Sequence, residues 1–238
     1  MITLSRSEAI SAVRKNLDEL SLSGSAMYNS ESTDNEDLDN IIARTLPDAI
    51  NEVNLSAPLH ILEGVEPRKR YTENGTPGSD YSSVSIDSKV LSFSFKGPFL
   101  RLIELRISDT PYTVDGVIME NSPEARKQLN PHIRGTYDKP RLVLLNGGLS
   151  SPSFRYYSLK TDQTFDFDRW VTSGTGTFPI HKLSYVPLAK YEEEQPDYQI
   201  ADLLRSPIIN HLTGLVLTIF KDTASAEQFF AAAKSMLQ

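Results

Sequence analysis

The spacing of apolar residues changes twice along the 238-residue chain. In residues 1–58 and 196–238, apolar side chains recur every three or four positions, which is the period of an amphipathic helix. In residues 59–195, apolar and polar side chains alternate in several short runs, which is typical of strands. The pattern predicts an α+β fold in which the N- and C-terminal helices pack as a helical bundle domain, residues 1–58 and 196–238. Residues 59–195 then form a β-rich insertion domain.

Two helices are predicted at the N-terminal side. The first spans residues 5–20, and its start is marked by Ser5 and Glu8, which have the spacing of a capping box. The second spans residues 34–54. Pro47 lies inside it, and proline removes one backbone hydrogen bond and clashes with the preceding turn. We therefore expect a kink or a break about two residues before this proline.

Strands are predicted throughout the middle of the chain. The longest alternating runs, residues 90–95 and 99–107, are expected to be neighbouring strands separated by Gly97 and Pro98. A short helix is expected after Ser122, which has the chemistry of an N-terminal cap. Shorter strands are predicted at residues 59–62, 117–119, 140–145, 154–159 and 183–186.

The C-terminal region is predicted to hold two more helices. The first begins near Ile200, is interrupted at Pro207, and carries an apolar stripe wider than one helical face. Its apolar run is too short to span a membrane, which needs roughly 20 residues. We expect this helix to be covered partly by its own chain and partly by another chain, through the candidate interface residues Ile208, Ile209, Leu217 and Phe220. Thr223 is expected to cap the final helix.

The charge of the chain argues against tight binding to nucleic acid. The formal net charge is −7 at pH 7, whereas proteins that grip DNA present concentrated lysine and arginine. One short basic run occurs, Arg68, Lys69 and Arg70, which is interpreted either as a solvated loop or as an interface segment. The chain has no cysteine, so disulfides, thiolate metal sites and a cysteine nucleophile are excluded.

Residue patterns for catalysis are missing from the sequence. The histidines (His60, His132, His181 and His211) lack metal-ligand spacing, and His211 is interpreted as a packed or inter-subunit histidine. The glycine-containing stretches match neither a phosphate-binding loop nor a dinucleotide fingerprint, and no nucleophile elbow occurs. The sequence thus predicts a protein that is not an enzyme and that uses no cofactor or metal.

An aromatic segment surrounds the single tryptophan. Trp170 is accompanied by Phe165, Phe167 and Phe178, with glycine and proline nearby. Two interpretations stay open. The segment is either an interface anchor on a loop or the closure of one end of the β-domain core.

Several stretches resemble a known family of virion proteins. The stretches MITLSRSEAISAVRKNLDEL and EDLDNIIARTLPDAINEVNLSAP are similar to the opening helices of the head–tail connector (adaptor) proteins of tailed phages. The chain also ends, as those proteins do, in a helix–helix unit. In the middle, FLRLIELRISD, NSPEARKQLNPHIRGTYDKPRLVLL and RYYSLK resemble the β-rich insert of virion ring proteins from Bacteroidetes phages, including the crAss-like phages.

This resemblance implies a structural role in the virion. It implies a homo-oligomeric ring, with twelve copies, that binds the portal protein and adjacent tail or ring proteins. DNA would pass through the lumen without tight binding, and the protein would be located at the head–tail junction after assembly in the host cytoplasm. No membrane partner is expected.

Two other interpretations stay open. In one, the chain is a monomeric glycan-binding or adhesin-like β module in which Trp170 and the tyrosines stack on sugar rings. In the other, it is a hydrolase whose catalytic groups meet only in space, which a single sequence does not reveal.

Overall fold

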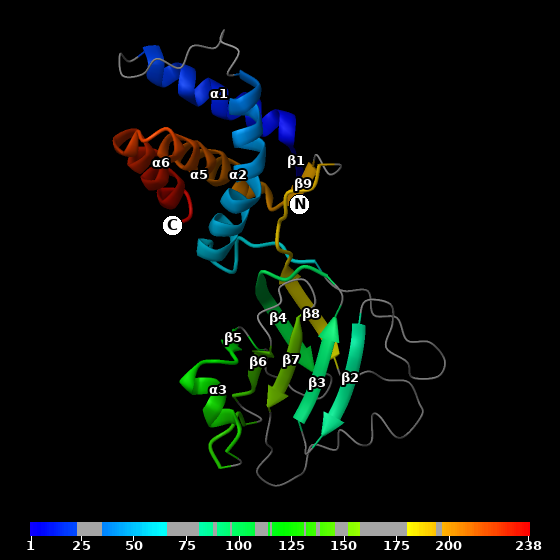
Figure 1. Cartoon of the computed structure of the whole chain (residues 1–238). Helices are drawn as coiled ribbons and strands as arrows, with labels where there is room; N and C mark the ends of the chain where they lie inside the picture. Colours follow the sequence, from blue (N-terminus) through cyan, green and yellow to red (C-terminus); the bar gives the residue numbers. More distant parts are fainter. Residues whose placement is uncertain are drawn as a thin grey trace. The chain divides into compact units, whose positions relative to one another are not determined.

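The chain forms an α+β structure made of two compact units (Figure 1). The computed structural model describes residues 1–22, 35–65, 81–87, 90–95, 97–107, 114, 116–130, 132–136, 139–145, 152–157, 180–193 and 197–238. Helices lie toward both ends of the chain and strands predominate in its centre, so the predicted fold class is confirmed. The first unit combines Met1–Glu63 with Ala189–Gln238, and the second is Gly64–Leu188.

The boundaries of the two units differ from the predicted positions 58/59 and 195/196 for local reasons. Residues 59–62 form a turn rather than the predicted strand, with the Ile61 N–H bonded to the Pro58 carbonyl at 3.1 Å. At the return to the first unit, Asn51 bonds both backbone groups of Ala189, each at 2.9 Å. Both segments therefore belong to the helical unit.

The helical unit contains the terminal helices and one small sheet. The predicted cap of the first helix is confirmed, because the Glu8 N–H donates to the Ser5 hydroxyl at 3.1 Å. The unit's elements are β1 (Ile2–Ser5), α1 (Arg6–Leu22), α2 (Asn35–Ser56), β9 (Asp197–Ile200), the 3-10 turn η1 (Asp202–Leu204), α5 (Arg205–Ile219) and α6 (Thr223–Ser235).

A two-stranded ribbon joins the two ends of the helical unit. Strands β1 and β9 pair antiparallel, with Ile2 opposite Ile200 and Ser5 opposite Asp197. The expectation that a helix begins near Ile200 is therefore wrong. Four-residue strands are too short for their alternation to stand out from the helical pattern that follows.

The helical core forms where α1, α2 and α6 contact α5. Helices α1 and α5 run in the same direction, because two contacts between them join residues separated by the same 197 positions. These contacts are Glu8 with Arg205 and Asn16 with Thr213. The fully buried apolar residues of this core are Leu4, Ala9, Val13, Ile42, Leu46, Ala49, Leu204, Ile208, Leu212, Val216 and Leu217.

The two prolines affect the helices differently. Helix α2 continues through Pro47 without a break, and the Thr45 hydroxyl bonds the Ile41 carbonyl at 2.7 Å in the preceding turn. Pro207 lies in the first turn of α5, where a missing backbone N–H costs nothing because that group has no partner within the helix. The helix therefore begins two residues before Pro207, and the proline does not interrupt it.

The β unit contains two sheets around one core. A five-stranded sheet has the order β2-β3-β7-β6-β5, and a two-stranded sheet pairs β4 with β8. All pairs are antiparallel except β5 with β6. The elements are β2 (Tyr81–Asp87), β3 (Val90–Phe95), β4 (Arg101–Ile107), β5 (Val117–Met119), α3 (Pro123–Gln128), β6 (Arg141–Leu145), β7 (Ser153–Tyr157) and β8 (Ile180–Val186).

The two longest predicted strands are found, but they are not neighbours. Strand β3 pairs with β2 and β7, whereas β4 pairs with β8 in the other sheet. Residues of both sheets share one core, in which the rings of Phe93 and Phe154 stack at 5.2 Å and Phe99 meets Phe154 edge-on. Gly97, with φ 142°, lies in the segment where the chain passes from one sheet to the other.

Candidate protein interface

Helix α5 is predicted to be covered partly by its own chain and partly by another chain, and the structure buries the middle of its apolar stripe within this chain. Ile208 and Leu217 are 0% exposed, so their prediction as interface residues is wrong. Ile209 is partly buried, and Phe220 is 42% exposed. The physical reason is that α1, α2 and α6 all pack against α5, so the chain itself covers the middle of its wide apolar stripe.

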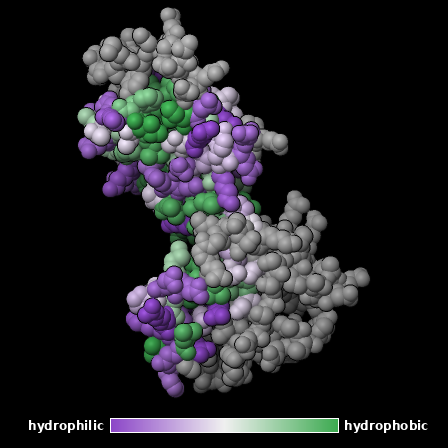
Figure 2. Space-filling model, viewed as in Figure 1, coloured by the Kyte–Doolittle hydropathy of each residue, from purple (hydrophilic) through white to green (hydrophobic). Residues whose placement is uncertain are grey.

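Exposed apolar side chains are found at the two ends of α5. Leu203, just before the first turn, is 71% exposed. Ile219 and Phe220, at the last turn, are 52% and 42% exposed. The helix has 15 residues and is about 22 Å long at 1.5 Å per residue, so the two apolar sites are well separated. Figure 2 shows apolar surface on the helical unit bordered by hydrophilic side chains.

A tight turn holds the second apolar site in place. Lys221 has a positive φ of 63°, its N–H bonds the Thr218 carbonyl at 3.0 Å, and the Asp222 N–H bonds the Leu217 carbonyl at 3.0 Å. This is the Schellman pattern, which ends a helix with a left-handed residue. The Asp222 side chain then caps α6 by accepting from the Ser225 N–H at 3.2 Å, so the cap is Asp222 and the predicted Thr223 cap is wrong.

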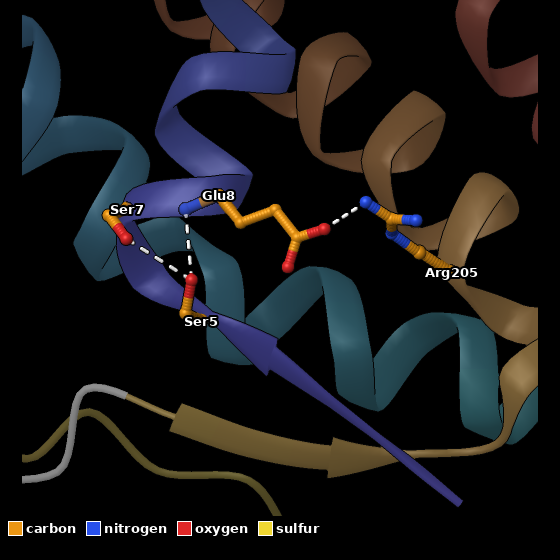
Figure 3. A network of polar contacts seen from close by, with 4 residues as sticks. All are labelled: Ser5, Ser7, Glu8 and Arg205. Carbon is orange, nitrogen blue, oxygen red and sulfur yellow. Dashed lines mark hydrogen bonds and ion pairs between the residues drawn. The ribbon is translucent and has the colours of Figure 1, made fainter.

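Charged and polar groups follow the first apolar site closely in sequence. Arg205, two residues after Leu203, pairs with Glu8 of α1, and the Ser5 hydroxyl bonds both the Glu8 N–H and Ser7 (Figure 3). Protein interfaces commonly combine exposed apolar contact residues with polar and charged side chains. The ion pair between Arg205 and Glu8 is exposed to solvent, so it contributes little to stability.

Side-chain contacts hold α5 against its neighbours α2 and α6. The His211 ring lies 5.0 Å from the Phe230 ring of α6, and its Nε2 is 2.6 Å from Glu52 Oε2 of α2. Within this chain His211 is thus a packed and bonded residue. Gly214 faces Phe230 so closely that an added Cβ would lie 2.6 Å from its ring.

All the remaining predicted site residues lie outside the described part of the chain. These are Arg68, Lys69, Arg70, Phe165, Phe167, Trp170 and Phe178. Within the described residues, no group of three or more histidine, aspartate or glutamate side chains is placed to hold a metal ion. No helix in the described ranges is long and apolar enough to cross a membrane.

Comparison with known protein families and with curated proteins finds no match. The candidate interface is therefore described from its geometry. Leu203 and Ile219 follow the helical spacing of the apolar stripe, but nothing in the sequence pattern marks them as contact residues. The sequence signal for their exposure was their position at the two ends of the helix, near Pro207 and near the turn at Lys221. A neighbouring helix covers the ends of α5 less completely than its middle.

Proposed function

We propose that this chain is a non-enzymatic structural virion protein, a ring-forming head–tail connector. In this role it bridges the portal and the downstream tail or ring proteins and surrounds the DNA channel. The proposal is supported by the resemblance of its terminal helices and β insert to such proteins. The structural observation that carries it is the pair of exposed apolar sites at opposite ends of α5, Leu203 at one end and Ile219 with Phe220 at the other.

Two different apolar sites on one subunit suit a ring better than a two-fold dimer. In a two-fold dimer the same patch meets itself, whereas a ring uses two different surfaces that meet head to tail. With Leu203 of one copy against Phe220 of the next, each copy uses both sites and the contact repeats until the ring closes. The ring would number twelve copies by the resemblance.

The charge of the chain is compatible with a channel for DNA. Its net charge of −7 repels phosphates, and an acidic lumen lets DNA pass without releasing counterions and without being held.

The proposal is tested by measuring the assembly of the purified chain, alone and mixed with its portal, by mass photometry and negative-stain microscopy. We expect rings, at least in the mixture, and we expect Leu203→Asp or Phe220→Asp to abolish them. Leu129→Asp is the matched control, because Leu129 is 65% exposed but lies in the β unit, and it should assemble normally. A chain that stays monomeric with the portal contradicts the proposal, and binding of that monomer to glycans would favour a glycan-binding module instead.

A further inference from the structure

A pocket in the β unit collects positive charge. It has a volume of about 440 Å³ and is lined by α3, the turn that follows it, β5 and the start of β6. Four cationic side chains line it, Lys127, Arg134, Lys139 and Arg141, against one carboxylate, Glu124. Pockets of this volume are of the size that holds small organic ligands.

The charge of this region contrasts with the rest of the chain. Residues 122–141 carry five cations, Arg126, Lys127, Arg134, Lys139 and Arg141, and two carboxylates, Glu124 and Asp138, although the whole chain has a net charge of −7. The cations are scattered along the sequence, so no basic run marks them. Folding brings four of them around one hollow, where their mutual repulsion favours the binding of an anion.

Hydrogen bonds of the Gln128 side chain hold one part of the pocket lining in place. Gln128 is buried, its Oε1 accepts from the Gly135 N–H at 2.7 Å, and its Nε2 donates to the Glu124 carbonyl at 3.2 Å. Gly135 lies against the sheet, because an added Cβ would be 2.6 Å from the Tyr157 carbonyl oxygen. The turn that carries Arg134 is therefore fixed in position, which reduces the entropy lost on binding.

Arg134 is the most favourably placed of the four cations. Its guanidinium lies 6.0 Å from the centre of the Tyr157 ring, and its Nε is buried with no hydrogen-bond partner among the described residues. Arg141 is the first residue of β6 and pairs in register with Tyr157, so it borders the same ring. Two arginines beside one aromatic ring provide planar donor groups whose fork matches phosphate oxygens.

We infer that this pocket binds a phosphorylated small molecule that carries two or more negative charges. The phosphate groups contact Arg134 and Arg141, with Lys127 and Lys139 at the rim. The organic part lies against Ile118 and Ile133, the aliphatic side chains of the lining. The volume exceeds that of a lone phosphate ion, so the pocket has room for an organic part as well. The net charge of −7 disfavours the long polyanion of a nucleic acid. This inference does not depend on the proposed ring assembly, and each of the two is tested by its own experiment.

The inference is tested by isothermal titration calorimetry of the full chain at low ionic strength. The probes are adenosine triphosphate, inorganic pyrophosphate, and a short single-stranded DNA oligonucleotide. We expect saturable binding of one adenosine triphosphate or pyrophosphate per chain. Arg134→Gln and Arg141→Gln should each weaken it by about tenfold or more, as expected for loss of a charged bidentate contact.

Matched variants separate a site from general charge attraction. Arg126→Gln removes one positive charge from α3, the helix whose Lys127 lines the pocket, but Arg126 itself does not line it. Binding of the probes to this variant should therefore change less than about twofold. If circular dichroism shows that Arg134→Gln disturbs folding, Lys139→Gln serves as a second variant of the pocket lining. Lys139 is exposed, so its replacement should leave the fold intact. The inference is overturned if no probe saturates at millimolar concentration, if Arg126→Gln weakens binding as much as Arg134→Gln, or if the oligonucleotide binds more tightly than pyrophosphate.

Discussion

The Asn16 side chain donates a hydrogen bond from Nδ2 to the Thr213 hydroxyl at 3.0 Å, and this bond joins the first helix of the chain to α5. Thr213 is fully buried, and its hydroxyl in turn donates to the Ile209 carbonyl at 2.9 Å. The bond therefore lies at the contact of two helices that are distant in sequence. It is one of the contacts that hold α1 in register with α5.

The Asn16–Thr213 contact leads to a first prediction about stability. Asn16→Ala removes one partner of a buried hydroxyl and should lower the free energy of unfolding by about 1–2 kcal/mol. Thr213→Val combined with it should cost less than the sum of the single changes, because the two groups interact. Urea unfolding followed by circular dichroism measures these differences. Arg205→Gln is the comparison, since the exposed ion pair of Arg205 with Glu8 should contribute less than about 1 kcal/mol. Additive effects of Asn16→Ala and Thr213→Val would contradict the predicted interaction between the two side chains.

A second prediction concerns the contact between α5 and α6. Gly214→Ala would add a Cβ 2.6 Å from Phe230 Cε1, and this overpacking should lower stability by about 1–2 kcal/mol despite the better helix propensity of alanine. Phe230→Leu in the same chain makes room for the methyl group and should recover part of the loss. Gly116→Ala serves as the control, because nothing lies within 4 Å of its added Cβ. A thermal unfolding midpoint unchanged by Gly214→Ala would show that the ring moves freely.

A third prediction follows from the backbone at Lys221. A residue with a side chain in the left-handed region is strained, and the strain costs roughly 1 kcal/mol. Lys221→Gly should therefore stabilise the helical unit by about 0.5–1 kcal/mol, as glycine is the favoured residue at this position of a Schellman motif. Lys221→Ala keeps the strain and should change stability by only a few tenths of a kcal/mol. The midpoint of urea unfolding distinguishes the two variants. If both raise stability equally, the increase comes from removal of the lysine charge and not from relief of backbone strain.

A fourth prediction concerns alkaline pH. Burial raises the pKa of the Tyr198 phenol above its ordinary value of 10.0, although the nearby Arg6 guanidinium opposes the shift. The phenol donates to the Lys190 carbonyl at 3.0 Å, which requires the protonated form. Because the folded pKa is the higher one, the stabilisation is complete below about pH 10 and is lost as the pH rises through the folded value.

The Tyr198→Phe variant separates this ionisation from the hydrogen bond. At pH 8 the variant should be less stable than the parent chain by about 1 kcal/mol, the contribution of one hydrogen bond. Above pH 10 the difference should shrink or reverse, since phenylalanine does not ionise. Unfolding curves in guanidinium chloride between pH 8 and pH 11 measure the difference. A constant difference over that range would contradict the role of burial.

Local signals made part of the fold predictable from sequence. The caps at Ser5 and Ser122 act over three residues, and both bonds are present, with the Ala125 N–H donating to the Ser122 hydroxyl at 3.2 Å. The change of apolar period separated the helical and β regions because burial on one face imposes that period. These features depend on neighbours in the sequence, which is why the sequence alone contains them.

Features set by distant residues were not predictable in the same way. The pairing of β4 with β8, Arg101 opposite Val186, depends on which strands meet in space, and periodicity does not encode it. The width of the apolar stripe on α5 was visible, but whether Ile208 meets its own chain or another was not. Likewise, the basic pocket needs Lys127 and Arg141 to meet through folding, so the sequence showed only separate cations.

The β unit interrupts the helical unit, and this has a consequence for folding during synthesis. The chain leaves the helical unit at Glu63, which pairs with the amino group of Met1, and returns at Ala189, which Asn51 holds. Helices α1 and α2 leave the ribosome long before α5 and α6, whereas the β unit is continuous in sequence. At about 5–20 residues per second, translation of Gly64–Leu188 takes roughly 6–25 s. During that time the faces of α1 and α2 that α5 later covers are accessible to a chaperone. We therefore expect the N-terminal segment to be the part of the nascent chain that a chaperone binds.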